Sequence, residues 1–176
     1  MLNYIFNSPL EGQKLEQVTK GHTVFGSGKR VDALLKTRGI ISSLCFCEIK
    51  THKTELLKQV KNSYRPECWA MSDEFAGGIA QIQKTVQKSI KGIDTKTQIK
   101  NEQGDLTGEE VFLYQPKSFL VIGSLKEFQG EHGTNEDKYS SFELLRQNIH
   151  KPEIITFDEL LERAKYIVKS ENKTEV

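Results

Sequence analysis

Several classes of protein are excluded by what this 176-residue sequence lacks. Its apolar runs fall far short of the roughly 20 residues that a membrane-spanning helix needs, so an integral membrane protein is excluded. No basic start followed by an apolar stretch opens the chain, and secretion is therefore not expected. With 25 basic and 24 acidic residues the net charge is close to zero, so global charge gives no argument for a polyanionic partner.

Cysteine is also scarce, with only Cys45, Cys47 and Cys68. An odd count without a framework spacing indicates a reducing compartment. A structural zinc site needs four ligands, and no second Cys/His pair stands at a suitable spacing. The mixture of apolar and charged residues is that of a globular chain long enough to bury a core without crosslinks. We therefore expect one domain over 1–176, with its core at about 22–169 and a charged, frayed tail at 170–176.

The residue patterns predict a protein that contains both helices and strands. A β-meander is expected over 22–50, with its central strand at 40–50, and short strands at 118–123 and 153–156. Helices are expected at 9–19, 54–62 and 72–91. Two capping boxes, Ser140 with Glu143 and Thr156 with Glu159, predict two further helices. Polar stretches at 92–110 and 124–138 predict loops.

The stretch from Asp32 to Lys50 carries the most chemical information. Alternation along a strand places Glu48 and Lys50 on one face, and Asp32 in the neighbouring strand could pair beside Glu48. Two carboxylates placed together repel each other unless a cation compensates them. Mg²⁺, which Mn²⁺ can replace, would be held by Asp32, Glu48 and the carbonyl of Ile49. Lys50 would orient the attacking water or neutralise charge on the phosphate, as in the PD-(D/E)xK arrangement of metal-dependent nucleases.

Glu-x-Lys on a strand is common, and it usually marks a solvated face. Here it directly follows an apolar run at 44–47, which favours a site over an ordinary exposed face. A structural scaffold with a solvated Glu-x-Lys remains an alternative, and it predicts no affinity for metal.

Longer segments around this motif resemble the nuclease domain of Shedu antiphage defence proteins. The resemblance covers about residues 25–168 and implies an α/β protein of the restriction-endonuclease-like fold, with a central mixed β-sheet flanked by helices. It is carried by EIKTHKTELL (48–57), YRPE (64–67), DEFAGGIAQIQ (73–83), QPKSFLVIGS (115–124) and FELLRQNIHKPEIITFDELLERA (142–164).

The resemblance implies that Asp32 and Glu48 bind the metal, that Lys50 is the catalytic lysine and that Gln81 is a site residue. It further implies a Mg²⁺-dependent deoxyribonuclease, an endonuclease or nicking enzyme, in bacterial antiviral defence. Double-stranded DNA would be the substrate, a homo-oligomer (dimer or tetramer) the assembly and the bacterial cytoplasm the location. At about 100° of rotation per residue, Gln81 falls on a flank of the apolar stripe of the helix at 72–91. That stripe is formed by Phe75, Ile79, Ile82, Val86 and Ile90.

Candidates for contact with the DNA backbone are His52, Arg65, Lys84 and Lys88, although exposed lysines on a helix are common. Shedu proteins usually carry a variable region before this domain, so the chain resembles either a fragment or a minimal member. An acidic residue on an N-terminal helix often joins such sites, and Glu11 and Glu16 are both candidates. A second hypothesis is a catalytically inactive module of the same fold that binds DNA or a protein partner.

Overall fold

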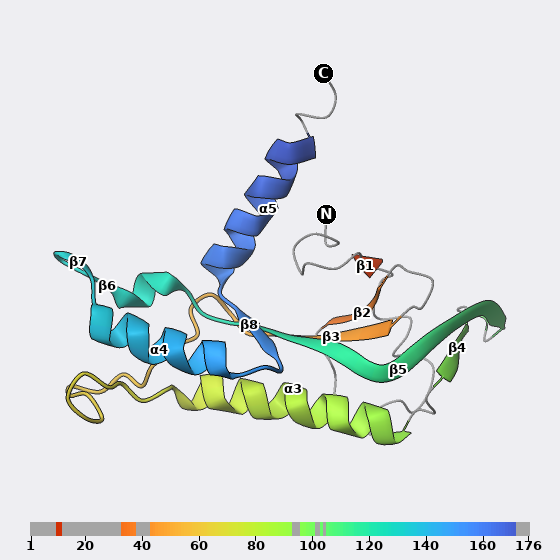
Figure 1. Cartoon of the computed structure of the whole chain (residues 1–176), viewed down its shortest axis with the longest axis horizontal. Helices are drawn as coiled ribbons and strands as arrows, with labels where there is room; N and C mark the ends of the chain where they lie inside the picture. Colours follow the sequence, from red (N-terminus) through yellow and green to blue (C-terminus); the bar gives the residue numbers. More distant parts are fainter. Residues whose placement is uncertain are drawn as a thin grey trace.

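The computed structural model describes residues 10–11, 33–37, 43–92, 96–100, 103 and 105–171. These residues form a sheet with helices on both sides (Figure 1). In chain order the elements are β1 (Leu10–Glu11), β2 (Ala33–Thr37), β3 (Ser43–Ile49), α3 (Asp73–Gly92), β4 (Lys96–Lys100), β5 (Leu106–Val121), the 3₁₀ turn η1 (Leu125–Phe128), β6 (Gln129–Gly130), β7 (Gly133–Thr134), α4 (Glu136–Asn148), β8 (Glu153–Ile155) and α5 (Phe157–Glu171).

The central sheet is mixed, as expected. Its strand order is β1-β2-β3-β5-β4, and β8 pairs with β5 as well. Strands β3, β5 and β8 run parallel to one another, whereas β1–β2, β2–β3 and β4–β5 are antiparallel pairs. The prediction of an α/β protein with a mixed sheet flanked by helices is confirmed, and the antiparallel β2–β3 pair confirms the described part of the predicted meander.

The two faces of the sheet carry separate apolar cores. On one face Leu120 packs with residues from α3, α4 and η1, including Phe75, Phe142 and Phe128. On the other face Cys45, Cys47, Phe119, Val121 and Ile155 pack against the first turns of α5. Figure 1 shows this arrangement, with α3 and α4 on one side of β3, β5 and β8 and α5 on the other. A strand buried on both faces explains why the predicted central strand reads as a continuous apolar run.

Helix α3 lies close to its predicted bounds. Ser72 caps it by accepting a hydrogen bond from the Phe75 amide at 3.0 Å, and two acidic residues occupy the first turn. The buried face is rotated from the predicted stripe, because Ile90 is 47% exposed while Thr85 and Ser89 are buried. Their hydroxyls donate to backbone carbonyls one turn back, which satisfies them inside the core. A count of apolar residues alone cannot show that two polar residues, Thr85 and Ser89, occupy buried positions of the helix.

The C-terminal elements confirm one capping box and overturn the other. Strand β8 forms as predicted, and the Thr156 amide donates to the Glu159 carboxylate at 2.8 Å while Thr156 Oγ1 accepts from the Glu159 amide at 3.4 Å. The box of Ser140 with Glu143 is wrong. Helix α4 begins at Glu136, five residues earlier than a cap at Ser140 predicts, because Asn135 caps it by accepting from the Lys138 amide at 3.0 Å.

The helix predicted at 54–62 is wrong, since these residues form an irregular loop. The carboxylate of Glu127 accepts hydrogen bonds from the amides of Leu56 and Leu57, at 2.6 and 3.0 Å. The same segment pairs with the residues before α3, for example through the bridge of Leu57 with Met71. These distant partners replace the local hydrogen bonds of a helix.

The loop predicted at 92–110 is also wrong, because its described residues include β4 and the start of β5, which form an antiparallel pair. The strand predicted at 118–123 is the end of the 16-residue β5. Short elements, η1, β6 and β7, occupy the loop predicted at 124–138. In the predicted helix at 9–19 the two described residues form β1, and the remainder lies outside the described residues, as do 22–32, 38–42 and most of the tail. Within the described part of the chain, no helix combines the length and apolar composition needed to cross a bilayer.

Candidate active site

The candidate site lies at the end of β3, on the face of the sheet that α3 covers. Glu48 is paired in register with Leu120 of β5, which belongs to the core beneath α3. The parallel ladder continues past the last residue of β3, since the amide of Lys50 donates to the Val121 carbonyl at 2.9 Å. The backbone that carries Glu48, Ile49 and Lys50 is therefore fixed by the centre of the sheet.

Glu48 and Lys50 form an ion pair in this position. Lys50 Nζ lies 3.2 Å from Glu48 Oε1, and their side chains are 23% and 5% exposed. A buried carboxylate needs charge compensation, which the lysine supplies here, and the Lys50 side chain itself is partly exposed. The pair confirms that the two side chains share a face.

Gln81 joins this pair from α3. Lys50 Nζ donates to Gln81 Oε1 at 3.3 Å, and Gln81 is half-buried on the flank of the helix beside its buried face. The structure thus brings together three of the four residues singled out from the sequence, although Lys50 and Gln81 are 31 positions apart along the chain. Ser72 fixes where α3 begins, and the helix lies against the sheet here because its buried face packs with Leu120 of β5.

Asp32, the fourth residue, lies outside the described residues, and so does Glu16. Glu11 lies in β1. The nearest described neighbour of Asp32 is Ala33, which pairs with Cys47 in the β2–β3 ladder. Among the residues that the structure describes, no group of three His, Cys, Asp or Glu side chains could hold a metal ion. Glu48 offers carboxylate oxygens at this place, which are ligands of the kind that Mg²⁺ prefers, and Ile49 follows it directly along the backbone.

The thiols on the opposite face of β3 do not take part in this chemistry. Cys45 is fully buried, and burial raises the pKa of its thiol to about 12. A thiol with such a pKa stays protonated and is a poor nucleophile or metal ligand. Cys45 and Cys47 therefore act as small core residues, as their place in the apolar run indicates.

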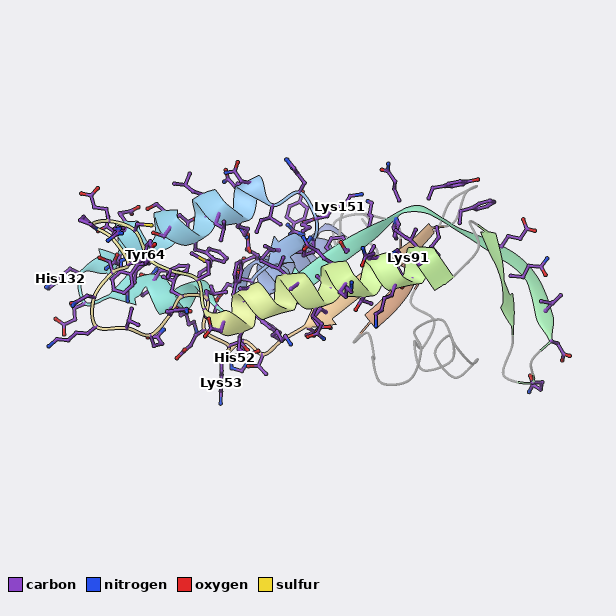
Figure 2. All side chains as sticks on the ribbon, turned by 90° about the horizontal axis from the view of Figure 1, so that it is seen from below. His52, Lys53, Tyr64, Lys91, His132 and Lys151 are labelled. Carbon is purple, nitrogen blue, oxygen red and sulfur yellow. The ribbon has the colours of Figure 1, made fainter. Side chains whose placement is uncertain are left out.

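The four candidates for DNA contact are exposed but are not gathered in one place. The ring of His52 packs edge-on against Phe157 with centroids 6.0 Å apart, and Arg65 lies over the ring of Tyr64. Lys84 Nζ donates to Gln87, and Lys88 lies one turn further along α3. Figure 2 shows Tyr64 at one end of the molecule, His52 beneath the start of α3, and Lys91 far along the same helix.

Two residues near the site escaped the sequence analysis. Gly78 of α3 faces Leu120 and the Lys50 stem, and Glu127 of η1 holds the loop that follows Lys50. The pair of glycines in a helix interior was an available signal for the first, because glycine there is unfavourable and needs a reason. No local signal marks Glu127, whose partners lie about 70 residues away.

Comparison with known proteins gives a consistent family. A family model described as "Shedu protein SduA, C-terminal" matches residues 3–161. The chain is 28% identical over 173 residues to Shedu protein SduA of Bacillus cereus (strain B4264). That match covers 96% of this chain and 42% of the relative, so the chain spans less than half the length of that protein. By the extent of the family match, the chain belongs to the family of Shedu SduA C-terminal sequences.

Proposed function

We propose that this chain is a metal-dependent deoxyribonuclease that acts in bacterial antiviral defence. The observation that carries the proposal is the convergence of Glu48, Lys50 and Gln81 between β3 and α3. Membership of the Shedu SduA family supports the defence role. A buried carboxylate beside a partly exposed lysine at a strand end is a group that a hydrolase of phosphodiesters can use.

The metal would be Mg²⁺, with Mn²⁺ as a substitute, held by Glu48, the Ile49 carbonyl and Asp32. Asp32, which lies outside the described residues, is included because the family resemblance implies it as a metal ligand and because it directly precedes Ala33, the register partner of Cys47. Two carboxylates and a carbonyl make an oxygen donor set that suits Mg²⁺. When bound, the ion would polarise a phosphoryl oxygen and make a hydroxide nucleophile accessible near neutral pH.

Lys50 and Gln81 would supply the rest of the chemistry. An ammonium group has three donors, and the contacts to Glu48 and Gln81 use two of them. The remaining hydrogen can bond to the attacking water or to a phosphate oxygen, where the positive charge stabilises the developing negative charge. The neutral amide oxygen of Gln81 would hold Lys50 in place whether or not Glu48 is engaged elsewhere.

The substrate we propose is double-stranded DNA, cut internally or nicked, by a homo-oligomer (dimer or tetramer) in the bacterial cytoplasm. His52, Arg65, Lys84 and Lys88 are exposed and can contact phosphates along the length of the molecule. Such contacts position a duplex without reading its sequence. Their spread favours an extended contact with the backbone over a compact binding pocket.

The alternative is a module that binds DNA or protein and has lost turnover. An ion pair of Glu48 with Lys50 would then serve only to compensate a buried charge. This alternative predicts DNA retention that does not depend on metal or on either residue.

Cleavage of supercoiled and linear DNA with Mg²⁺ or Mn²⁺ tests the proposal, with EDTA as the control. Wild type should cut, and EDTA or Glu48→Gln should abolish cutting while the chain stays folded. Glu55→Gln, at an exposed position of the loop after β3, is the matched control and should cut normally. DNA binding without metal-dependent cutting by the wild type would favour the binding module.

A further inference from the structure

Two adjacent glycines, Gly77 and Gly78, lie in the first half of α3. Glycine in a helix interior is unfavourable relative to alanine, because it loses more conformational freedom on folding. The surroundings of the two differ sharply. A Cβ added at Gly77 would meet nothing within 4 Å, whereas a Cβ at Gly78 would lie 3.1 and 3.3 Å from the two Leu120 methyl carbons and 3.7 Å from Lys50 Cε.

Gly78 therefore marks a close approach of α3 to the sheet, at the place where the site is built. Leu120 is fully buried and is the register partner of Glu48. Gln81 follows Gly78 by three residues and holds the Lys50 ammonium. One glycine thus faces both the strand beside Glu48 and the stem of the lysine.

We propose that Gly78 is a positioning residue of the proposed active site. Its missing side chain lets α3 lie close enough to β5 and Lys50 for the Gln81 amide to hold the lysine. The inference rests on the proposed function for its catalytic consequence, but the geometric part stands without it.

A methyl group at position 78 would be too close to Leu120 by a few tenths of an ångström, whereas its 3.7 Å distance from Lys50 Cε is an ordinary van der Waals contact. Leu120 is enclosed by the core on that face of the sheet, so the helix, which carries Gln81, has to move instead. The Lys50–Gln81 contact, at 3.3 Å, is already at the long end for a hydrogen bond, and such a shift breaks it. At Gly77 the same methyl group is harmless.

The first test measures this contact without any activity. In the full chain, the side-chain amide signal of Gln81 is assigned in a ¹H–¹⁵N spectrum by its loss in Gln81→Leu, and its shift in Lys50→Ala defines the broken contact. Gly78→Ala should move the signal toward its Lys50→Ala position, and Gly77→Ala should leave it unchanged. An unchanged signal in Gly78→Ala would overturn the proposal.

A second variant separates positioning from general damage to the fold. Adding Leu120→Val to Gly78→Ala makes room for the methyl group, so the Gln81 signal should return to its position in Leu120→Val alone. Should Gly78→Ala fail to fold, this pair of variants carries the test. A signal that stays at the Lys50→Ala position in the double variant would contradict the proposal.

Kinetics give the catalytic consequence. Gly78→Ala should lower kcat for DNA cleavage by roughly 10- to 100-fold, because a displaced catalytic group is costly, with KM for DNA unchanged. Gly77→Ala should match wild type, and Leu120→Val should restore most of the loss in the double variant. If wild type does not cut DNA, the proposed function fails while the amide signal still decides the role of Gly78. If wild type cuts and Gly78→Ala cuts equally well, the role of Gly78 fails while the nuclease stands.

Discussion

Two groups of charged side chains are partly buried against the sheet, and they are built differently. Arg146 of α4 donates to both oxygens of Glu159, at 2.7 and 2.6 Å, and to Glu143 at 2.9 Å. At the candidate site, Lys50 makes one contact to Glu48 and one to Gln81, at 3.2 and 3.3 Å. The short contacts of Arg146 Nη1 with both carboxylate oxygens of Glu159 fix α4 to α5. The longer, single contacts of a flexible lysine leave its charge available to a substrate.

Electrostatics support the structural role of the Arg146 group. Burial alone would lower the pKa of Arg146, but its hydrogen bonds to Glu159 and Glu143 raise that pKa above its ordinary value. Burial alone would raise the pKa of Glu159, but the hydrogen bonds from Arg146 and the Thr156 backbone hold it below its ordinary value. Both groups are thus stabilised in their charged forms by the folded state. On this contrast we base the proposal that charge near this sheet serves two purposes, a structural one at Arg146 and a catalytic one at Lys50, which substitution can separate.

The largest expected effect on stability is that of Arg146→Met, which leaves Glu143 and Glu159 without their cation. The free energy of unfolding should fall by about 3 kcal/mol, while DNA cleavage by the folded protein stays unchanged. Urea unfolding and cleavage rates check this. Arg163→Met removes the cation of an exposed pair with Glu153 and is the matched control. It should lower the free energy of unfolding by less than about 1 kcal/mol. A loss of cleavage with unchanged stability in Arg146→Met would reverse the assignment of the two groups.

Glu127 is a charged residue near the candidate site whose contacts indicate a structural role. Glu127→Ala leaves the buried amides of Leu56 and Leu57 unpaired and should lower the free energy of unfolding by about 2 kcal/mol. Cleavage should fall far less than in substitutions of Lys50. Glu131→Ala, at the exposed β6–β7 turn, should have no measurable effect on unfolding in the same urea titration. Equal stability of the two variants would show that the carboxylate does not anchor the loop.

A smaller effect is expected in the pH dependence of stability, which tests the contact of Glu159 with Arg146. Because Glu159 has a lower pKa in the folded state, its contribution to stability is fully present above its ordinary pKa of 4.5 and is lost as the pH falls below that value. Stability of wild type relative to Glu159→Gln, from urea unfolding, should therefore be greatest near neutral pH and shrink in acid. A difference that grows on acidification would contradict the lowered pKa.

The smallest effect concerns backbone strain in the loop between β3 and α3, and it does not depend on charge. Pro66 and Glu67 form the centre of a tight turn closed by Arg65 and Cys68, and Glu67 has a φ of 60°. Glycine is preferred at this position of such a turn, so Glu67→Gly should raise the free energy of unfolding by about 0.5 kcal/mol. Glu67→Gln keeps the strain and removes the charge, and its stability should equal that of wild type. A gain in Glu67→Gln instead would assign the effect to charge.

The parts of the fold that were predictable are those with local signals. Helix α3 has its cap at Ser72, and α5 has the box of Thr156 with Glu159. The β4–β5 pair was missed because its residues are largely polar, and the loop at 54–62 was misassigned because its partner is the distant Glu127. Signals that depend on another part of the chain cannot be read from a short window of residues.

The site was predictable to a similar degree. Strand alternation placed Glu48 with Lys50, and the flank of a helix together with the family resemblance pointed to Gln81. The glycine pair in α3 was an available signal, but which of the two faces β5 and Lys50 depends on how the helix packs on the sheet. Asp32, outside the described residues, stays a prediction.

The most direct test of the central claim is the initial rate of supercoiled DNA cleavage at saturating Mg²⁺ by wild type, Lys50→Ala and Lys53→Ala. Lys53 is an exposed lysine three residues further on, and Figure 2 shows it directed away from the molecule. The account predicts a loss of roughly 10³-fold or more in Lys50→Ala and a rate close to wild type in Lys53→Ala, with each protein assayed at a temperature at which circular dichroism shows it to be folded. Cleavage by Lys50→Ala at the wild-type rate would contradict it.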